Sequence, residues 1–124
     1  MNSSKKILVV EDELPIRSAL IEKLSREGFT MSEAANGEMG LIVAEHENPD
    51  LILLDINMPR LDGLGMLTAL RATDWGKNTK VIVLTNSGES EKVAEALENG
   101  AFDFLVKSDW KIEDVVTKVC SVLV

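Results

Sequence analysis

Five side chains that could do chemistry stand at the ends of apolar runs along the chain. Glu11 and Asp12 close "KILVVED", Asp55 closes "LILLD", Thr85 closes "KVIVLT" and Lys107 closes "DFLVK". If these runs end at one edge of a sheet, three carboxylates, a hydroxyl and an ammonium group lie close together. Carboxylates that lie close together repel one another and raise one another's pKa unless a cation intervenes. The set therefore predicts a site for a cation.

A hard divalent ion such as Mg²⁺ suits this set, because Mg²⁺ takes oxygen ligands from one or two carboxylates, water and phosphate. Glu11, Asp12 and Asp55 could supply part of that shell. Zinc is disfavoured, since the only histidine, His46, and the only cysteine, Cys120, stand apart from these acids. A metal ion, a lysine and a hydroxyl together form a pocket for phosphate. Asp55 could then be a nucleophile that takes phosphorus covalently.

Continuous apolar runs indicate the strands that would position these residues. Four runs, at residues 6–12, 51–55, 80–85 and 103–107, are typical of strands buried on both faces of a parallel sheet. A fifth, weaker candidate is "FTMSEA" at 29–34, whose polar content fits an edge strand.

Segments with helical spacing separate the strands, at residues 15–27, 38–47, 64–72, 89–99 and 112–123. Pro15 suits the first turn of the first helix, Gly28 suits its C-terminal cap, and Asp109 is a candidate cap for the last helix. The alternation predicts a doubly wound, five-stranded parallel α/β sandwich with right-handed crossovers. Ligands of such sheets bind outside the carboxyl ends of the strands, where the five side chains are expected.

Length and composition fit one globular domain, which we expect to span residues 1–124 with its core from about residue 5. The chain has 124 residues, of which 45% are hydrophobic and 27% charged. A formal net charge of −8 argues against nucleic acid, because phosphate binding depends on an excess of Lys and Arg. No apolar stretch reaches the length of a membrane span or of a signal-peptide core, so a cytoplasmic location is expected.

The chain resembles a response regulator receiver domain, the CheY-like phosphoacceptor module of two-component signalling. The resemblance runs from about residue 5 to residue 124 and rests on "VVEDE" at 9–13, "LLDINMPRLDG" at 53–63, "VIVLT" at 81–85 and "GAFDFLVK" at 100–107. One of these motifs would be weak evidence, whereas all four in this order and spacing are highly specific. The resemblance implies the flavodoxin-like, three-layer (βα)5 fold of that family.

The resemblance implies a role for each candidate residue. Asp55 would accept a phosphoryl group from a sensor histidine kinase or a phosphotransfer protein, in a reaction that depends on Mg²⁺ and in which Mn²⁺ could substitute. Glu11, Asp12, Asp55 and the backbone carbonyl of Asn57 would hold the ion. Lys107 would pair with the phosphoryl oxygens or, before phosphorylation, with Asp55. The acidic pair differs from the two aspartates usual in the family, which leaves Asp12 as the closer ligand.

The resemblance also implies a conformational switch. The hydroxyl of Thr85 would turn towards the phosphoryl group, and the Phe104 side chain would follow it. The helix at 89–99, the strand that ends at Lys107 and the last helix would form the face that an output domain or a target protein reads. A homodimer that forms on phosphorylation is left open. The chain would dephosphorylate itself without acting as an enzyme on other substrates, and no contact with nucleic acid or membrane is implied.

Three further positions depart from the family pattern. Ser108 follows Lys107 where proline is usual, and a cis bond there would cost about 2.5 to 4 kcal/mol; this cost favours trans, while both isomers stay open. Asn86 follows Thr85 where the family generally has a small residue, which would narrow access to the phosphoryl group. Phe104 has no hydroxyl, so its switching would work by packing alone.

Two rival functions stay open. A Mg²⁺-dependent phosphatase or phosphotransferase would use the same aspartyl-phosphate chemistry on exogenous substrates, but such enzymes commonly carry a second acid where Asn57 stands. A flavodoxin-like cofactor-binding module would share the fold, but no glycine-rich loop follows "KILVV". The chain could be a stand-alone receiver or a part of a larger regulator or hybrid kinase.

Overall fold

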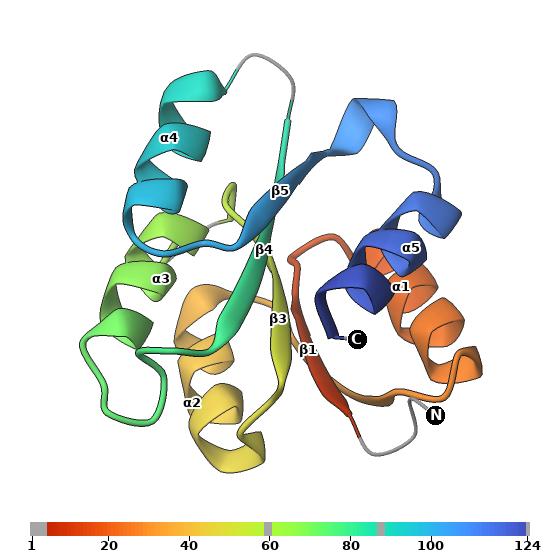
Figure 1. The fold of residues 1–124 in the computed structure, drawn as a ribbon, viewed down its shortest axis with the longest axis horizontal. Coiled ribbons are helices and arrows are strands. Elements are labelled where there is room, and N and C mark those ends of the chain that lie inside the picture. The colour runs from red at the N-terminus through yellow and green to blue at the C-terminus, as the bar shows by residue number, and fades with distance from the viewer. Residues whose placement is uncertain (1–4, 59–60, 87–88, 124) are drawn as a thin grey trace.

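The computed structural model describes residues 5–58, 61–86 and 89–123, in which strands and helices alternate along the chain (Figure 1). The elements are β1 (Lys6–Val10), α1 (Leu14–Arg26), β2 (Thr30–Ala34), α2 (Gly37–Glu47), β3 (Leu51–Asp55), α3 (Gly63–Arg71), β4 (Lys80–Thr85), α4 (Ser90–Glu98), β5 (Asp103–Val106), the 3₁₀ helix η1 (Lys107–Asp109) and α5 (Ile112–Leu123). The strands pair in parallel in the order β2-β1-β3-β4-β5. This arrangement confirms the predicted fold class.

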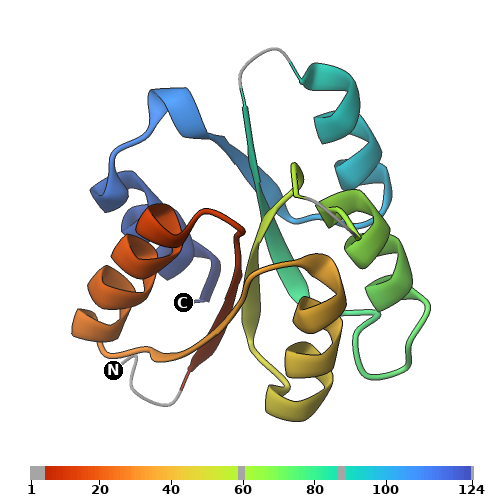
Figure 2. The same cartoon turned by 180° about the vertical axis from the view of Figure 1, so that it is seen from behind.

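Helices cover both faces of the sheet. α1 and α5 lie side by side on one face and α2, α3 and α4 on the other, as Figure 1 and the view from behind in Figure 2 both show. Alternate side chains of one strand enter opposite cores, since Ile7 and Val9 pack under α1 and α5 while Leu8 and Val10 pack under the other helices. The apolar runs therefore lack alternation because both faces of the sheet are covered.

The prediction that four strands are buried on both faces is right for β1, β3 and β4 and wrong for β5. β5 lies at an edge of the sheet and pairs with β4. Its residues are half-buried except for Phe104, which is exposed. An edge strand has a neighbour on one side only, so its side chains keep contact with solvent. β2 forms the other edge, as its polar content predicts.

Local signals set the helix ends to within one residue of the predicted bounds. Pro15 stands in the first turn of α1, and Gly28 follows its end with a φ of 99°, a left-handed conformation that favours glycine. α5 begins at Ile112 as predicted, and the side chain of its candidate cap, Asp109, lies outside the described part of the structure. At the start of this helix the Asp114 carboxylate accepts a hydrogen bond from the Lys111 N–H. Among the described residues, the helices lack the length and apolar character that crossing a membrane requires.

The start of α3 packs directly against the backbone that carries Asp55. A Cβ atom on Gly63 would collide with the backbone of Asp55 and Ile56, so this close approach requires glycine. Asp62 caps the same helix end, since its carboxylate accepts a hydrogen bond of 2.8 Å from the Gly65 N–H. The glycine therefore determines how the end of β3 sits beneath α3.

Replacing Gly63 with alanine should lower the free energy of unfolding by about 2 to 3 kcal/mol, because the clash is with backbone that cannot rotate away. Gly65→Ala is the matched control in the same helix. Its Cβ would meet the flexible end of the Leu61 side chain, and the gain in helix propensity of about 1 kcal/mol should offset that contact. Urea denaturation measures both variants, and equal losses would contradict this explanation.

Candidate functional site

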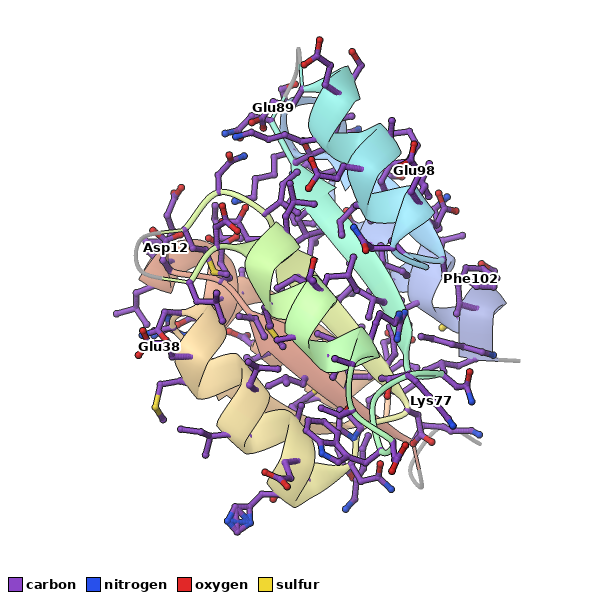
Figure 3. The ribbon with its side chains drawn as sticks, turned by 90° about the vertical axis from the view of Figure 1, so that its left-hand side faces the viewer. Asp12, Glu38, Lys77, Glu89, Glu98 and Phe102 are labelled. Atoms are coloured by element: carbon purple, nitrogen blue, oxygen red, sulfur yellow. The ribbon has the colours of Figure 1, made fainter. Side chains whose placement is uncertain are left out.

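The loops that follow β1, β3, β4 and β5 all leave the sheet at the carboxyl ends of its strands. Strand order reverses between β1 and β3, and this reversal marks the place where sheets of this kind bind ligands. Figure 3 shows Asp12 and Glu89 at this edge and Lys77 towards the opposite end of the sheet. Asp55 and Thr85 end β3 and β4, while Glu11 and Asp12 follow β1 and Lys107 follows β5, so the fold brings these residues to one edge.

A lysine and two carboxylates form a buried ion-pair cluster at this edge. Lys107 Nζ lies 2.7 Å from Glu11 Oε1 and 3.1 Å from Asp55 Oδ2. Both carboxylates are almost fully buried, with 0% of Glu11 and 1% of Asp55 exposed. One ammonium group therefore lies beside two carboxyl groups that are shielded from solvent.

Lys107 reaches the cluster through a trans peptide bond. It is the first residue of η1, and the Lys107–Ser108 bond is trans, as its intrinsic cost favours. Only 12% of the Lys107 side chain is exposed. The serine in place of the usual proline thus leaves the ammonium group beside Asp55.

Burial raises the pKa of both carboxyl groups. Burial raises the pKa of Glu11 to about 7, and the ion pair with Lys107 and the hydrogen bond from the Glu13 N–H offset only part of that effect. Burial likewise raises the pKa of Asp55, against the opposing effects of the Asn57 N–H and of Lys107. Burial alone would lower the pKa of Lys107, but its contacts with the two acids outweigh burial and raise it. Lys107 therefore stays charged, and the cluster has too little positive charge for two ionised acids.

A third carboxylate completes a group that could hold a metal ion. One oxygen each from Glu11, Asp12 and Asp55 lies within 4.8 Å of the others. Asp12 Oδ1 is buried and accepts no hydrogen bond from the described residues, a costly arrangement without a cation. Three clustered carboxylates, one of which has a buried oxygen without a partner among the described residues, suit a hard cation such as Mg²⁺.

The loop after β3 folds back on the Asp55 carboxylate. The Asn57 N–H donates a hydrogen bond of 3.0 Å to Asp55 Oδ1, while Oδ2 faces Lys107. Each oxygen of Asp55 therefore has its own partner, which holds the carboxylate in one orientation. Asn57 is brought beside the acid cluster as predicted, and its carbonyl as a metal ligand stays a prediction.

Thr85 joins the site through Glu89, a residue to which the sequence analysis assigns no role. Thr85 Oγ1 lies 3.1 Å from the Asn86 carbonyl oxygen and 3.2 Å from Glu89 Oε1. Glu89 Oε1 also accepts hydrogen bonds from the Asn86 N–H at 2.8 Å and from Asn57 Nδ2 at 2.6 Å. Lys92 Nζ lies 3.0 Å from Glu89 Oε2 and donates to Asn57 Oδ1 at 2.9 Å. These contacts join β4, α4 and the loop after β3.

Glu89 is ionised in this network. Burial alone would raise its pKa, but its contacts with Lys92, Asn57, Asn86 and Thr85 outweigh burial and lower the pKa to about 2.

One sequence signal could have identified Glu89. An asparagine followed three residues later by a glutamate, just before an apolar helical segment, is the spacing of a capping box, in which the glutamate reaches back to the earlier N–H.

Phe104 and Thr85, the predicted switch pair, share one hollow. The two residues line one hollow of about 220 Å³ between α4 and β5. Phe104 is 37% exposed, so its ring is in contact with both solvent and this hollow. The role of the pair in switching stays a prediction.

Comparisons with known proteins agree on one family. The family model of the response regulator receiver domain matches residues 7–119. Sporulation initiation phosphotransferase F of Bacillus subtilis is 38% identical over 104 residues, which cover 84% of this chain and 82% of that protein. The transcriptional regulatory protein SrrA of Staphylococcus aureus is 39% identical over 97% of this chain, which spans about half of SrrA (48%). The chemotaxis response regulator CheY4 of Vibrio cholerae superposes with a TM-score of 0.88 at 30% identity, over 95% of this chain and 98% of that one.

Replacing Lys107 with alanine should destabilise the protein strongly when metal is chelated, because two buried carboxylates lose their cation. The expected loss in free energy of unfolding is about 3 to 5 kcal/mol, and added Mg²⁺ should restore part of it. Lys118→Ala is the control, since it breaks an ion pair with Asp103 in which 31% and 33% of the side chains are exposed. That pair should contribute under about 1 kcal/mol. Similar losses in free energy of unfolding for the two variants would contradict the claim that Lys107 balances the charge of two buried carboxylates.

The raised pKa of Glu11 predicts a stability that falls with rising pH in the absence of metal. The pKa in the folded state, about 7, exceeds the unperturbed 4.5, so the unfolded chain releases its proton first as the pH rises. The contribution of this group to the free energy of unfolding should fall between these two pH values, by on the order of 3 kcal/mol. Urea denaturation with EDTA across this range should show a flatter profile for Glu11→Gln. An identical slope in that variant would show that another group is responsible.

Proposed function

Since this chain belongs to the family of response regulator receiver domains, we propose that it is a signalling switch controlled by phosphorylation of Asp55. The proposal takes residues 1–124 as one receiver domain. The observation that carries it is the buried cluster at the end of β3, in which Asp55 contacts a lysine and lies beside two further acids. A carboxylate placed in this way has the partners that phosphoryl transfer requires.

Asp55 is the nucleophile in this proposal. One of its oxygens attacks the phosphorus of a phosphohistidine on a histidine kinase or a phosphotransfer protein. The P–N bond breaks, its electron pair leaves with the imidazole, and the imidazole nitrogen takes up a proton. The product is a mixed anhydride between Asp55 and phosphate. The hydrogen bond from the Asn57 N–H holds the carboxylate in place for this attack.

Glu11, Asp12, Asp55 and the carbonyl of Asn57 are the residues that would hold Mg²⁺, with Mn²⁺ as a substitute. When bound, the ion neutralises the oxygens of the transferring phosphoryl group. Asp12 has a buried oxygen with no partner among the residues that the structure describes, which supports its place as a ligand. Lys107 adds the second positive charge, because its ammonium group already lies 3.1 Å from Asp55 Oδ2 and can turn to a phosphoryl oxygen.

Hydrolysis resets the switch. A water molecule attacks the phosphorus, the P–O bond to Asp55 breaks, and inorganic phosphate leaves. The chain thus catalyses the loss of its own phosphoryl group and turns over no other substrate. Phosphatases of the rival class commonly carry a second acid near the nucleophile, whereas the Asn57 side chain at that place is an amide that contacts Glu89 and Lys92.

Phosphorylation adds a charge of roughly −1.5 to −2 at neutral pH and three acceptor oxygens next to Thr85 and Lys107. The Thr85 hydroxyl turns to one of these oxygens, and the Phe104 ring moves in the hollow that both residues line. The change reaches the face formed by α4, β5 and α5, where Leu97 and Phe104 are exposed. An output domain, a target protein or a second copy of the chain reads that face. A cytoplasmic location stays a prediction.

Incubation with acetyl phosphate and Mg²⁺, followed by intact mass measurement, tests the proposal. The wild-type chain should gain one phosphoryl group, Asp55→Ala none, and Asp74→Asn, a change at an exposed surface acid, the same amount as the wild type. EDTA should prevent the gain. An unmodified wild type, or a phosphoryl group retained by Asp55→Ala, would contradict the proposal. Multiple turnover of p-nitrophenyl phosphate would instead support the phosphatase.

A further inference from the structure

Glu89 binds three parts of the site at once. Its Oε1 accepts hydrogen bonds from the Asn86 N–H, from Asn57 Nδ2 and from Thr85 Oγ1, and its Oε2 pairs with Lys92. Glu89 itself is the residue that precedes α4 (Figure 3). The carboxylate therefore connects the start of α4 to the end of β4 and to the loop that follows Asp55.

The contact with Thr85 competes with the phosphoryl group. A threonine hydroxyl carries one proton, so it donates to one acceptor at a time. Among the described residues the Thr85 hydroxyl contacts two acceptors, the Asn86 carbonyl oxygen at 3.1 Å and the anionic Glu89 Oε1 at 3.2 Å. Thr85 is 1% exposed, so water does not readily replace these partners. A bond from Thr85 to a phosphoryl oxygen requires the hydroxyl to leave them.

The contact with Asn57 adds to this competition. Asn57 donates to Glu89 Oε1 at 2.6 Å and accepts from Lys92 at 2.9 Å, so its side chain is tied to α4 at both ends. A displacement of the start of α4 breaks these bonds together with that of Thr85. Hydrogen bonds to a charged group are stronger than bonds between neutral groups, so their loss disfavours the displaced state.

We infer that Glu89 is a positioning residue that holds Thr85 and the start of α4 in the unphosphorylated arrangement. The inference rests on the proposed function, because it concerns how far phosphorylation shifts the switch. A phosphoryl group changes the balance between two states only by its differential contacts with them. The contacts of Glu89 favour the unphosphorylated state and so reduce that shift.

A purely structural role for Glu89 makes a different prediction. The bond from the Asn86 N–H alone would make Glu89 a cap of the turn before α4, worth about 1 kcal/mol of stability. Loss of such a cap would lower the free energy of unfolding without moving Thr85 and without changing the affinity for a phosphoryl group. The two roles are therefore separated by the position of Thr85 and by the affinity for a phosphoryl mimic.

Beryllofluoride with Mg²⁺ is the probe, since it mimics a phosphoryl group on a carboxylate without being hydrolysed. The variants are Glu89→Gln, which keeps the shape and removes the charge, and Glu89→Ala, which removes the acceptor. Glu91→Gln is the matched control, an exposed acid in the first turn of the same helix. Titrations followed by NMR measure both the affinity and the signals of Thr85.

Glu89→Ala should bind beryllofluoride about tenfold more tightly than the wild type, the equivalent of one hydrogen bond to a charged group. Glu89→Gln should lie between the two, and Glu91→Gln should match the wild type. Before any beryllofluoride is added, the Thr85 signals of both Glu89 variants should be displaced towards those of the beryllofluoride-bound wild type.

Glu89 variants that match Glu91→Gln in affinity and in the Thr85 signals would overturn the inference, as would weaker binding by either variant. In that case the wild type still binds the probe and still gains a phosphoryl group from acetyl phosphate, so the proposed function stands. A wild type that does neither would overturn the proposed function and the inference with it.

Discussion

One ammonium group balances two buried carboxylates at the edge of the sheet, and the chemistry of the site follows from this shortage of positive charge. Lys107 contacts both Glu11 and Asp55, yet burial still raises the pKa of both acids. Asp12 adds a third carboxylate with a buried oxygen that lacks a partner among the described residues. A divalent cation would relieve this repulsion, and in the proposed function the cation and Lys107 together provide the positive charge that a phosphoryl group needs.

The parallel sheet stabilises the fold in spite of this concentration of charge. Its central strands are covered by helices on both faces and supply the apolar core, so their carboxyl ends can carry polar groups. Glu11 and Asp12 follow β1, and Asp55 ends β3, the strand beside β1 at the reversal of strand order. Lys107 follows β5. Gly63 lets α3 approach the backbone of Asp55, which fixes the acid at the end of its strand.

The sequence predicts what depends on pattern and misses what depends on the direction of side chains. Continuous apolar runs and motif order predict the fold, the edge of the sheet and the residues Asp55, Asp12 and Lys107, because parallel strands must end on the same side. The exposure of β5 depends on its place in the sheet, which a short apolar run does not reveal. The closer approach of Lys107 to Glu11 than to Asp55 depends on rotamers, and so does the reach of Glu89 to Thr85.

The central claim is that Asp55 accepts a phosphoryl group beside a metal ion held by its neighbouring acids. A crystal structure with Mn²⁺ and beryllofluoride tests it most directly, because anomalous scattering locates the ion and electron density locates the beryllofluoride. The account predicts the ion on the carboxylates of Asp12 and Asp55, beryllium bonded to an oxygen of Asp55, and Lys107 in contact with a fluoride. An ion away from these acids, or beryllofluoride bound elsewhere on the chain, would contradict this claim.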